Sequence, residues 1–177
     1  MRSVIYLGLL GLALLTLAIV VRSGMFARHD PGEPINYAMR AALAEQAPQL
    51  STEDALAVSR LYPTAYAQPS GLRFIVRAPG KGSSHPHAGD EVTAHYEGRL
   101  LDGSRFDSSY ARGEPITFRV GTGQVIRGWD EAFLTMKRGE RRTLIIPYWL
   151  GYGEQGQPPA IPARATLVFD VELVDFR

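Results

Sequence analysis

The carboxy-terminal part of this 177-residue chain is dominated by runs in which apolar and polar residues alternate. Alternation places every second side chain on the same face of a strand, so such runs predict half-buried β-strands. From Gly71 onwards there are five of these runs, centred on Phe74, Tyr96, Phe118, Leu144 and Phe169. The Asp102-Gly103 pair has the composition of a hairpin turn. We therefore expect an antiparallel sheet with one buried face.

A single helical pattern interrupts these strands. Four apolar residues recur at the spacing of one helix face: Trp129, Ala132, Phe133 and Met136. Asp130 and Glu131 suit the first turn of such a helix, Lys137 and Arg138 suit the last, and Gly139 predicts its end. An apolar helix face packed on an apolar sheet face gives a two-layer α+β domain. We place this domain at residues 71–177 and expect five or six strands around one short helix.

The amino-terminal segment has a different character. Residues 4–21 are almost entirely apolar and uncharged, and Arg2 and Arg22 flank them. A helix of this length reaches about 27 Å, close to the ~30 Å thickness of the hydrocarbon layer of a membrane. A buried core helix would carry a polar stripe, which this segment lacks. Residues 1–22 are thus predicted to be an uncleaved membrane anchor or a cleaved signal peptide.

We favour the anchor, because the small-residue sites that a signal peptidase needs are weak here. A long folded domain can cross a membrane whatever the flanking charge, so we expect an extracytoplasmic location. We expect the domain at the periplasmic face of a bacterial inner membrane. The alternative is a soluble periplasmic or secreted protein after cleavage.

Residues 23–70 are predicted to be a linker with two short helices. The first covers residues 36–46. The second begins at Ser51, where Asp54 three residues later resembles a capping box, and runs to about Leu61 before Pro63. Because apolar residues such as Leu56 and Leu61 are sparse, this segment is a spacer or an oligomerisation arm.

Composition and motifs exclude several kinds of chemistry. The chain has no cysteine and a net charge of +1, which excludes thiol chemistry and argues against nucleic acid as a partner. The metalloprotease, phosphate-loop and serine-hydrolase motifs are missing, and His85-Pro86-His87 has no third metal ligand nearby. No cofactor or metal is expected. The many aromatic residues at strand ends and in loops instead suit a concave site for an apolar ligand.

Four segments, in order along 71–177, resemble the FKBP-type peptidyl-prolyl cis-trans isomerases: 96–109 (YEGRLLDGSRFDSS), 125–129 (VIRGW), Tyr152-Gly153, and Ile161-Pro162 with 165–173 (ATLVFDVEL). The resemblance implies an antiparallel half-barrel wrapped around the Trp129 helix. It also implies a pocket with Trp129 as its floor and walls made by Tyr96, Phe106, Val125, Ile126 and Phe169. In such a pocket Asp107 is the polar wall group, and Tyr152 and Ile161 lie over the mouth.

The resemblance further implies catalysis of cis–trans isomerisation of X–Pro bonds in protein or peptide substrates, assisted by Asp107, Tyr152, Phe106 and Tyr96. Arg112 joins the substrate-binding set, as does Ile116, which stands where the family commonly has an aromatic residue. Macrolides are the expected inhibitors. The alternatives are a non-catalytic FKBP-like binding module or chaperone, and an unrelated domain that binds a small ligand.

Overall fold

The five alternating runs form five of the seven strands of one antiparallel sheet in the computed structural model, which describes residues 48–177. Residues Pro48–Arg177 make one compact unit. The strands are β1 (Tyr66–Ala67), β2 (Arg73–Ala78), β3 (Glu91–Leu100), β4 (Arg105–Ser108), β5 (Ile116–Arg119), β6 (Arg141–Ile146) and β7 (Leu167–Phe176). The α+β fold expected from the sequence is confirmed. The two-residue strand β1 was not expected, because it is too short to show an alternating pattern.

The two longest strands, β3 and β7, lie at the centre of the sheet. The order is β1-β2-β6-β7-β3-β4, and every pair is antiparallel. The remaining strand, β5, also pairs with β3, along residues 91–94, while β4 pairs with residues 97–99 of the same strand. The edge of β3 is therefore shared by two short strands. A short helix, α4 (Ser109–Arg112), connects these strands.

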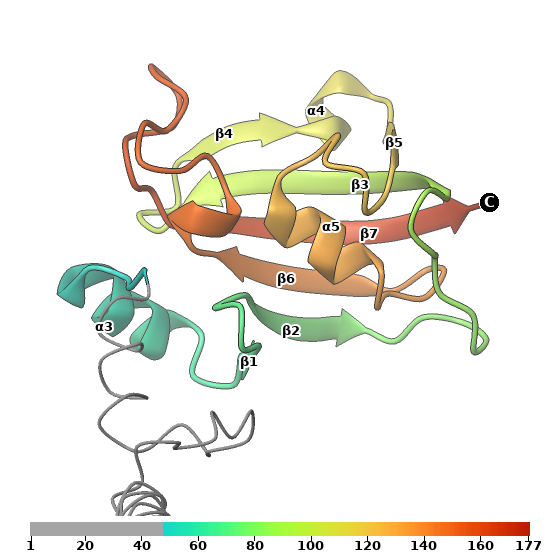
Figure 1. Cartoon of the computed structure of the whole chain (residues 1–177), viewed down its shortest axis with the longest axis horizontal. Helices are drawn as coiled ribbons and strands as arrows, with labels where there is room; N and C mark the ends of the chain where they lie inside the picture. Colours follow the sequence, from blue (N-terminus) through green and yellow to red (C-terminus); the bar gives the residue numbers. More distant parts are fainter. Residues whose placement is uncertain (1–47) are drawn as a thin grey trace, which may run out of the picture. The chain divides into compact units, whose positions relative to one another are not determined.

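The core lies between one face of this sheet and helix α5 (Arg127–Phe133), which crosses it in Figure 1. Trp129, Ala132 and Phe133 of α5 are buried there together with alternate residues of β3, β6 and β7. Gly128 permits the close approach, because a Cβ atom at this position would lie 2.7 Å from the Ile146 side chain. The sheet and the helix thus form the two layers that the sequence predicts.

Helix α5 ends earlier than the sequence indicates. We expected Lys137 and Arg138 in its last turn, but the helix ends at Phe133. The Gly139 N–H donates to the carbonyl of Leu173, and the carbonyl of Thr135 accepts from Arg142 instead of from the next helical turn. Met136 is nevertheless fully buried. Partners on β6 and β7 thus replace the hydrogen bonds of the expected last turn.

The predicted second helix is present as α3 (Thr52–Leu61). The Ser51 hydroxyl caps it by accepting from the Asp54 N–H at 3.0 Å. The Asp54 carboxylate does not complete a capping box. It accepts instead from the Thr166 hydroxyl, one residue before β7, at 2.5 Å.

Helix α3 also contributes an apolar contact. Val58 is only 1% exposed, although Leu56 and Leu61 remain exposed. Helix α3 and β1 therefore belong to the same compact unit as the sheet. The predicted apolar segment 4–21 and the predicted helix 36–46 lie outside the described residues. Within residues 48–177, no helix has the length and apolar character needed to cross a membrane.

Candidate active site

A cavity of about 730 Å³ opens between α5, β4 and the long loop before β7. Ten of the eleven residues predicted for the site line it: Tyr96, Phe106, Asp107, Ile116, Val125, Ile126, Trp129, Tyr152, Ile161 and Phe169. The eleventh, Arg112, does not line the cavity and reaches the site by pairing with Asp107 from outside. The volume is within the range of about 300–1,000 Å³ that is common for small-molecule sites.

The floor of the cavity is Trp129, which is 4% exposed. Its ring makes edge contacts with Tyr96 and Phe169, with centroids 4.9 and 5.2 Å apart. Phe118 and Phe133 pack beside it at 5.7 and 5.5 Å. Edge-to-face contacts of this kind fix ring orientation as well as burying apolar area. The Trp129 Nε1 atom has no hydrogen-bond partner among the described residues, so these rings enclose it without a polar contact.

One wall depends on an irregularity in β4. Phe106 and Asp107 are neighbours in sequence, yet both line the cavity, which a regular strand would not allow. The register explains this, because Gly98 pairs with Asp107 and Arg99 pairs with Arg105, which leaves Phe106 as an extra residue. Such a bulge redirects a side chain. The sequence signals neither the bulge nor its position.

The polar corner of the cavity is built around the Asp107 carboxylate. Its Oδ2 accepts from the Tyr96 hydroxyl, and its Oδ1 accepts from Arg112 and from the Ser108 N–H. Arg112 also donates to the Tyr96 hydroxyl oxygen at 2.8 Å. Burial raises the pKa of Asp107, but the hydrogen bonds from Tyr96 and Ser108 and the Arg112 charge outweigh it, so the pKa lies below its ordinary value. Asp107 is therefore ionised, and these hydrogen bonds fix the position of its carboxylate.

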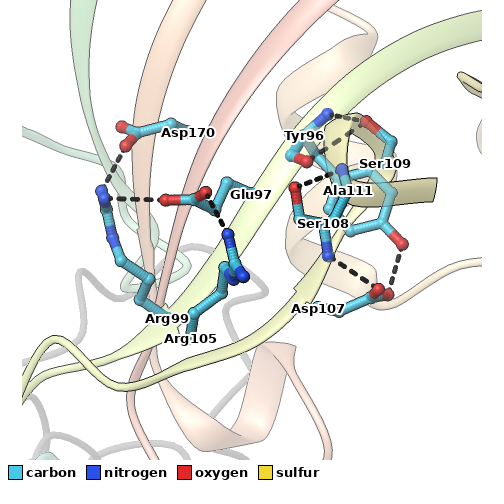
Figure 2. Close-up of polar contacts among 9 residues, drawn as sticks. All are labelled: Tyr96, Glu97, Arg99, Arg105, Asp107, Ser108, Ser109, Ala111 and Asp170. Carbon is cyan, nitrogen blue, oxygen red and sulfur yellow. Dashed lines mark hydrogen bonds and ion pairs between the residues drawn. The ribbon is translucent and has the colours of Figure 1, made fainter. Parts of the chain in front are cut away.

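The segment after Asp107 explains how Arg112 reaches this corner. The Ser108 hydroxyl caps α4 by accepting from the Ala111 N–H, as Figure 2 shows. The next hydroxyl, of Ser109, accepts from the Tyr96 N–H at 2.8 Å. Both serines are buried. The turn thus joins β4 to β3 and places Arg112 beside both Asp107 and Tyr96.

The start of α5 supplies a backbone donor at the cavity. Ile126 is the N-cap residue of α5, and its carbonyl accepts from the Trp129 N–H. The Ile126 N–H has no acceptor within residues 48–177. The preceding turn is held by Asp130, whose carboxylate accepts from the N–H groups of Gly121 and Gly123. A bound carbonyl oxygen is a suitable acceptor for the Ile126 N–H.

The loop over the mouth is a small hairpin. Gln157 and Ile161 exchange two backbone hydrogen bonds of 2.9 and 3.0 Å, and Pro158, Pro159 and Ala160 form its tip. The Tyr152 hydroxyl has no hydrogen-bond partner in the described part of the chain. Burial, and then the negative charge of Asp107, raise the pKa of Tyr152. Its hydroxyl is therefore protonated and available to donate to a ligand.

Five further lining residues are not among the predicted site residues: Gln124, Gln157, Pro158, Pro159 and Ala160. Gln124 precedes Val125, and residues 157–160 lead directly to Ile161, so their closeness in sequence to predicted residues is the signal that points to them. The described residues contain no group of three or more His, Asp or Glu side chains that could hold a metal ion. The cavity thus combines an aromatic floor with the hydrogen-bonded Asp107 carboxylate. It also has two donors that lack an acceptor within the described residues, the Ile126 N–H and the Tyr152 hydroxyl.

Comparison with known proteins shows the family to which the chain belongs. Residues 82–174, more than half of the chain, match the family described as FKBP-type peptidyl-prolyl cis-trans isomerase. The peptidyl-prolyl cis-trans isomerase FKBP15-1 of Arabidopsis thaliana is 52% identical over 115 residues, which are 62% of this chain and 75% of that protein. FK506-binding protein 1A of Aspergillus fumigatus is 52% identical over 104 residues, which are 59% of this chain and 93% of that protein.

Two further comparisons agree. The peptidyl-prolyl cis-trans isomerase FKBP2 of Homo sapiens is 57% identical over 86 residues, which are 49% of this chain and 61% of that protein. The crystal structure of AtFKBP13 has a TM-score of 0.61 and 40% identity, covering 64% of this chain and 98% of that chain. With the sequence match and the shared fold, the chain belongs to the FKBP-type peptidyl-prolyl cis-trans isomerase family and is an isomerase of X–Pro peptide bonds.

Proposed function

We propose that this isomerase acts on proline-containing protein chains and assists their folding, and that the reaction takes place in the cavity above Trp129. The observation that carries this proposal is an apolar, aromatic cavity of about 730 Å³ with a single held carboxylate. X–Pro isomerisation breaks no covalent bond. It has to lower a rotational barrier of about 18–20 kcal/mol that arises from the partial double-bond character of the amide.

Desolvation is the proposed source of the rate enhancement. The planar amide owes its double-bond character to a charge-separated resonance form, which water stabilises. Transfer of the prolyl amide onto the Trp129 floor removes that water, so the twisted, less polar transition state becomes relatively more favourable. Phe106 and Phe169 close the sides, with ring centroids 5.4 Å apart.

The polar groups are proposed to orient the substrate. The Ile126 N–H and the Tyr152 hydroxyl donate to the carbonyl on the proline side of the bond. The Asp107 charge acts on the carbonyl of the preceding residue, which turns during the reaction. Tyr96 and Arg112 hold the Asp107 carboxylate throughout, so the charge needs no reorganisation in the transition state.

The folding role is tested with a protein whose slow refolding phase is limited by prolyl isomerisation, which takes tens to hundreds of seconds uncatalysed. Catalytic amounts of the full chain should accelerate this phase. Tyr152→Phe should slow the catalysed phase by about two- to tenfold, the loss that corresponds to one hydrogen bond. Suppressed aggregation with an unchanged slow phase would instead favour a non-catalytic chaperone.

Macrolide binding at the same cavity is a second expectation. FK506-binding protein 1A carries the ligand in its name and is 52% identical to the aligned part of this chain. Addition of FK506 should inhibit isomerase activity and change the fluorescence of Trp129. Full activity at saturating FK506 would show that Ile116, which stands where the family commonly has an aromatic residue, leaves the macrolide without sufficient contact.

We also propose that residues 1–22 anchor the protein in a membrane with the isomerase domain on the extracytoplasmic side. The support is the uncharged apolar run at residues 4–21. Membrane fractionation followed by mass measurement of the mature protein tests this. An intact amino terminus in the membrane fraction supports the anchor, and a start near Ile19 or Gly24 supports a cleaved signal. An intact, cytoplasmic protein would contradict both.

A further inference from the structure

A chain of charged side chains crosses the face of the sheet that is opposite the cavity. On β3, Tyr96 points to the cavity and Glu97 points to the other side of the strand, as Figure 2 shows. The Glu97 Oε1 atom accepts from Arg99 at 3.1 Å, and its Oε2 atom lies 3.5 Å from the Arg105 guanidinium. Glu97 thus joins its own strand to β4.

Arg99 connects the ion pairs of Glu97 to the centre of the sheet. The second amino group of Arg99 pairs with Asp170 on β7. Asp170 also accepts from the Thr143 hydroxyl of β6 at 2.6 Å, and Thr143 is 1% exposed. The chain of contacts therefore runs from a buried hydroxyl on β6 to Arg105 on the edge strand β4. Isolated exposed ion pairs hold their side chains weakly, whereas linked pairs of this kind restrict each other.

The position of Arg105 gives the network its importance. Arg105 immediately precedes Phe106, the extra residue of the bulge, and β4 has no strand partner other than β3 within residues 48–177. The other end of the bulge, at Ser108, is held by the capping hydrogen bond of α4. The bulge is therefore fastened at both ends, by the Glu97–Arg105 pair and by the α4 cap (Figure 2).

We propose that Glu97 and Arg105 are positioning residues for the isomerase reaction. They hold the β4 bulge in the register that turns both Phe106 and Asp107 into the cavity, although neither Glu97 nor Arg105 lines it. This role rests on the proposed function of Phe106 and Asp107. Loss of the pair would let the start of β4 move away from β3 and would weaken the orientation of the two cavity residues.

The test compares kcat/KM of the full chain for a proline-containing peptide with that of Arg105→Ala and Glu97→Gln. Each variant should lose about two- to fivefold, which is the range for a partly exposed ion pair. Arg105→Lys, which keeps the charge, should recover part of the loss. Arg138→Ala is the matched control, because Arg138 pairs with Asp175 at similar exposure (54% against 57% for Arg105) away from β4. This control should keep the full activity.

A double-variant comparison separates positioning from a general loss of stability. In an Asp107→Asn background, Arg105→Ala should cost much less activity than it does in the wild type, because the group it positions is already impaired. Equal losses in both backgrounds, or no loss in the wild type, would overturn the positioning role. If Asp107→Asn itself is fully active, the proposed site is wrong, and the positioning role is overturned with it.

Discussion

At the level of single residues, the site depends on groups whose charge does not change near neutral pH. The hydrogen bonds to Asp107 outweigh burial and lower its pKa, whereas burial raises the pKa values of Tyr96 and Tyr152. No histidine lines the cavity. Each of the three cavity groups is thus predicted to keep one protonation state while the enzyme works.

This predicts that kcat/KM for a proline-containing peptide stays constant between about pH 5 and pH 9, since no cavity group titrates there. Because the pKa of Asp107 is lowered in the folded state, the ionised carboxylate stabilises the fold at pH values above the ordinary pKa of an aspartate. This stabilisation is lost as the pH falls through the lowered pKa. Measurement of kcat/KM at several pH values across this range checks the predicted constancy. A bell-shaped or sigmoidal profile centred near pH 6–7 would contradict it.

Single residues also show where sequence analysis reaches its limit. Asp107 pairs with Tyr96, 11 positions earlier, and with Arg112, five positions later, and neither strand nor helix periodicity predicts this pairing. Alternation placed Tyr96 and Phe169 correctly on the core face. It could not place Phe106 and Asp107 on the same wall, because the bulge in β4 breaks the two-residue period.

At the level of elements, the cavity wall depends on the close approach of β3 to two rings. A Cβ atom at Gly98 would lie 2.7 Å from ring carbons of both Phe106 and Phe169. Glycine is therefore required here for space. The backbone of β3 forms part of the surface on which these rings pack, opposite the bulge.

Gly98→Ala should displace the Phe106 ring and destabilise the fold by about 1–3 kcal/mol, the usual cost of overpacking. Activity should fall with it. Urea unfolding and kcat/KM measure the two effects. The double variant Gly98→Ala with Phe106→Leu should recover part of the stability but not the activity, because the contact with Phe106 is relieved while the contact with Phe169 remains and the aromatic wall is lost. Wild-type activity in Gly98→Ala would show that the wall tolerates displacement.

The helices illustrate what their sequences can and cannot predict. The Ser51 cap and the end of α3 at Leu61 follow from local signals and are confirmed. The end of α5 does not, because the Thr135 carbonyl is taken by Arg142 of β6 and the Gly139 N–H bonds to Leu173 of β7. Contacts between distant segments decide that boundary, and no local pattern contains them.

At the level of the whole molecule, the folded unit begins before the sheet, at Pro48. Helix α3 is attached by the buried Val58 and by the hydrogen bond between Asp54 and Thr166. This compact unit is longer than the domain predicted at residues 71–177, whose bounds stay a prediction.

Val58→Ala should lower the free energy of unfolding by about 1–3 kcal/mol, since a fully buried side chain is truncated. Leu56→Ala, on the same helix but 68% exposed, should change it by less than about 0.5 kcal/mol. Neither variant should alter kcat/KM, because neither residue lines the cavity. Denaturant unfolding measures the free energy of unfolding of both variants. Equal, small losses in the two would show that α3 is not part of the cooperative unit.

We propose that X–Pro isomerisation takes place in the cavity bounded by Phe106 and Asp107. The most direct test of this claim is a prolyl-peptide isomerisation assay on the full chain and on the double variant Phe106→Ala with Asp107→Ala, with unfolding curves to show that both proteins are folded. The predicted result is a fall in kcat/KM of more than about tenfold, equivalent to ~1.4 kcal/mol of transition-state stabilisation. Unchanged kcat/KM in the folded double variant would contradict the claim and place the reaction elsewhere.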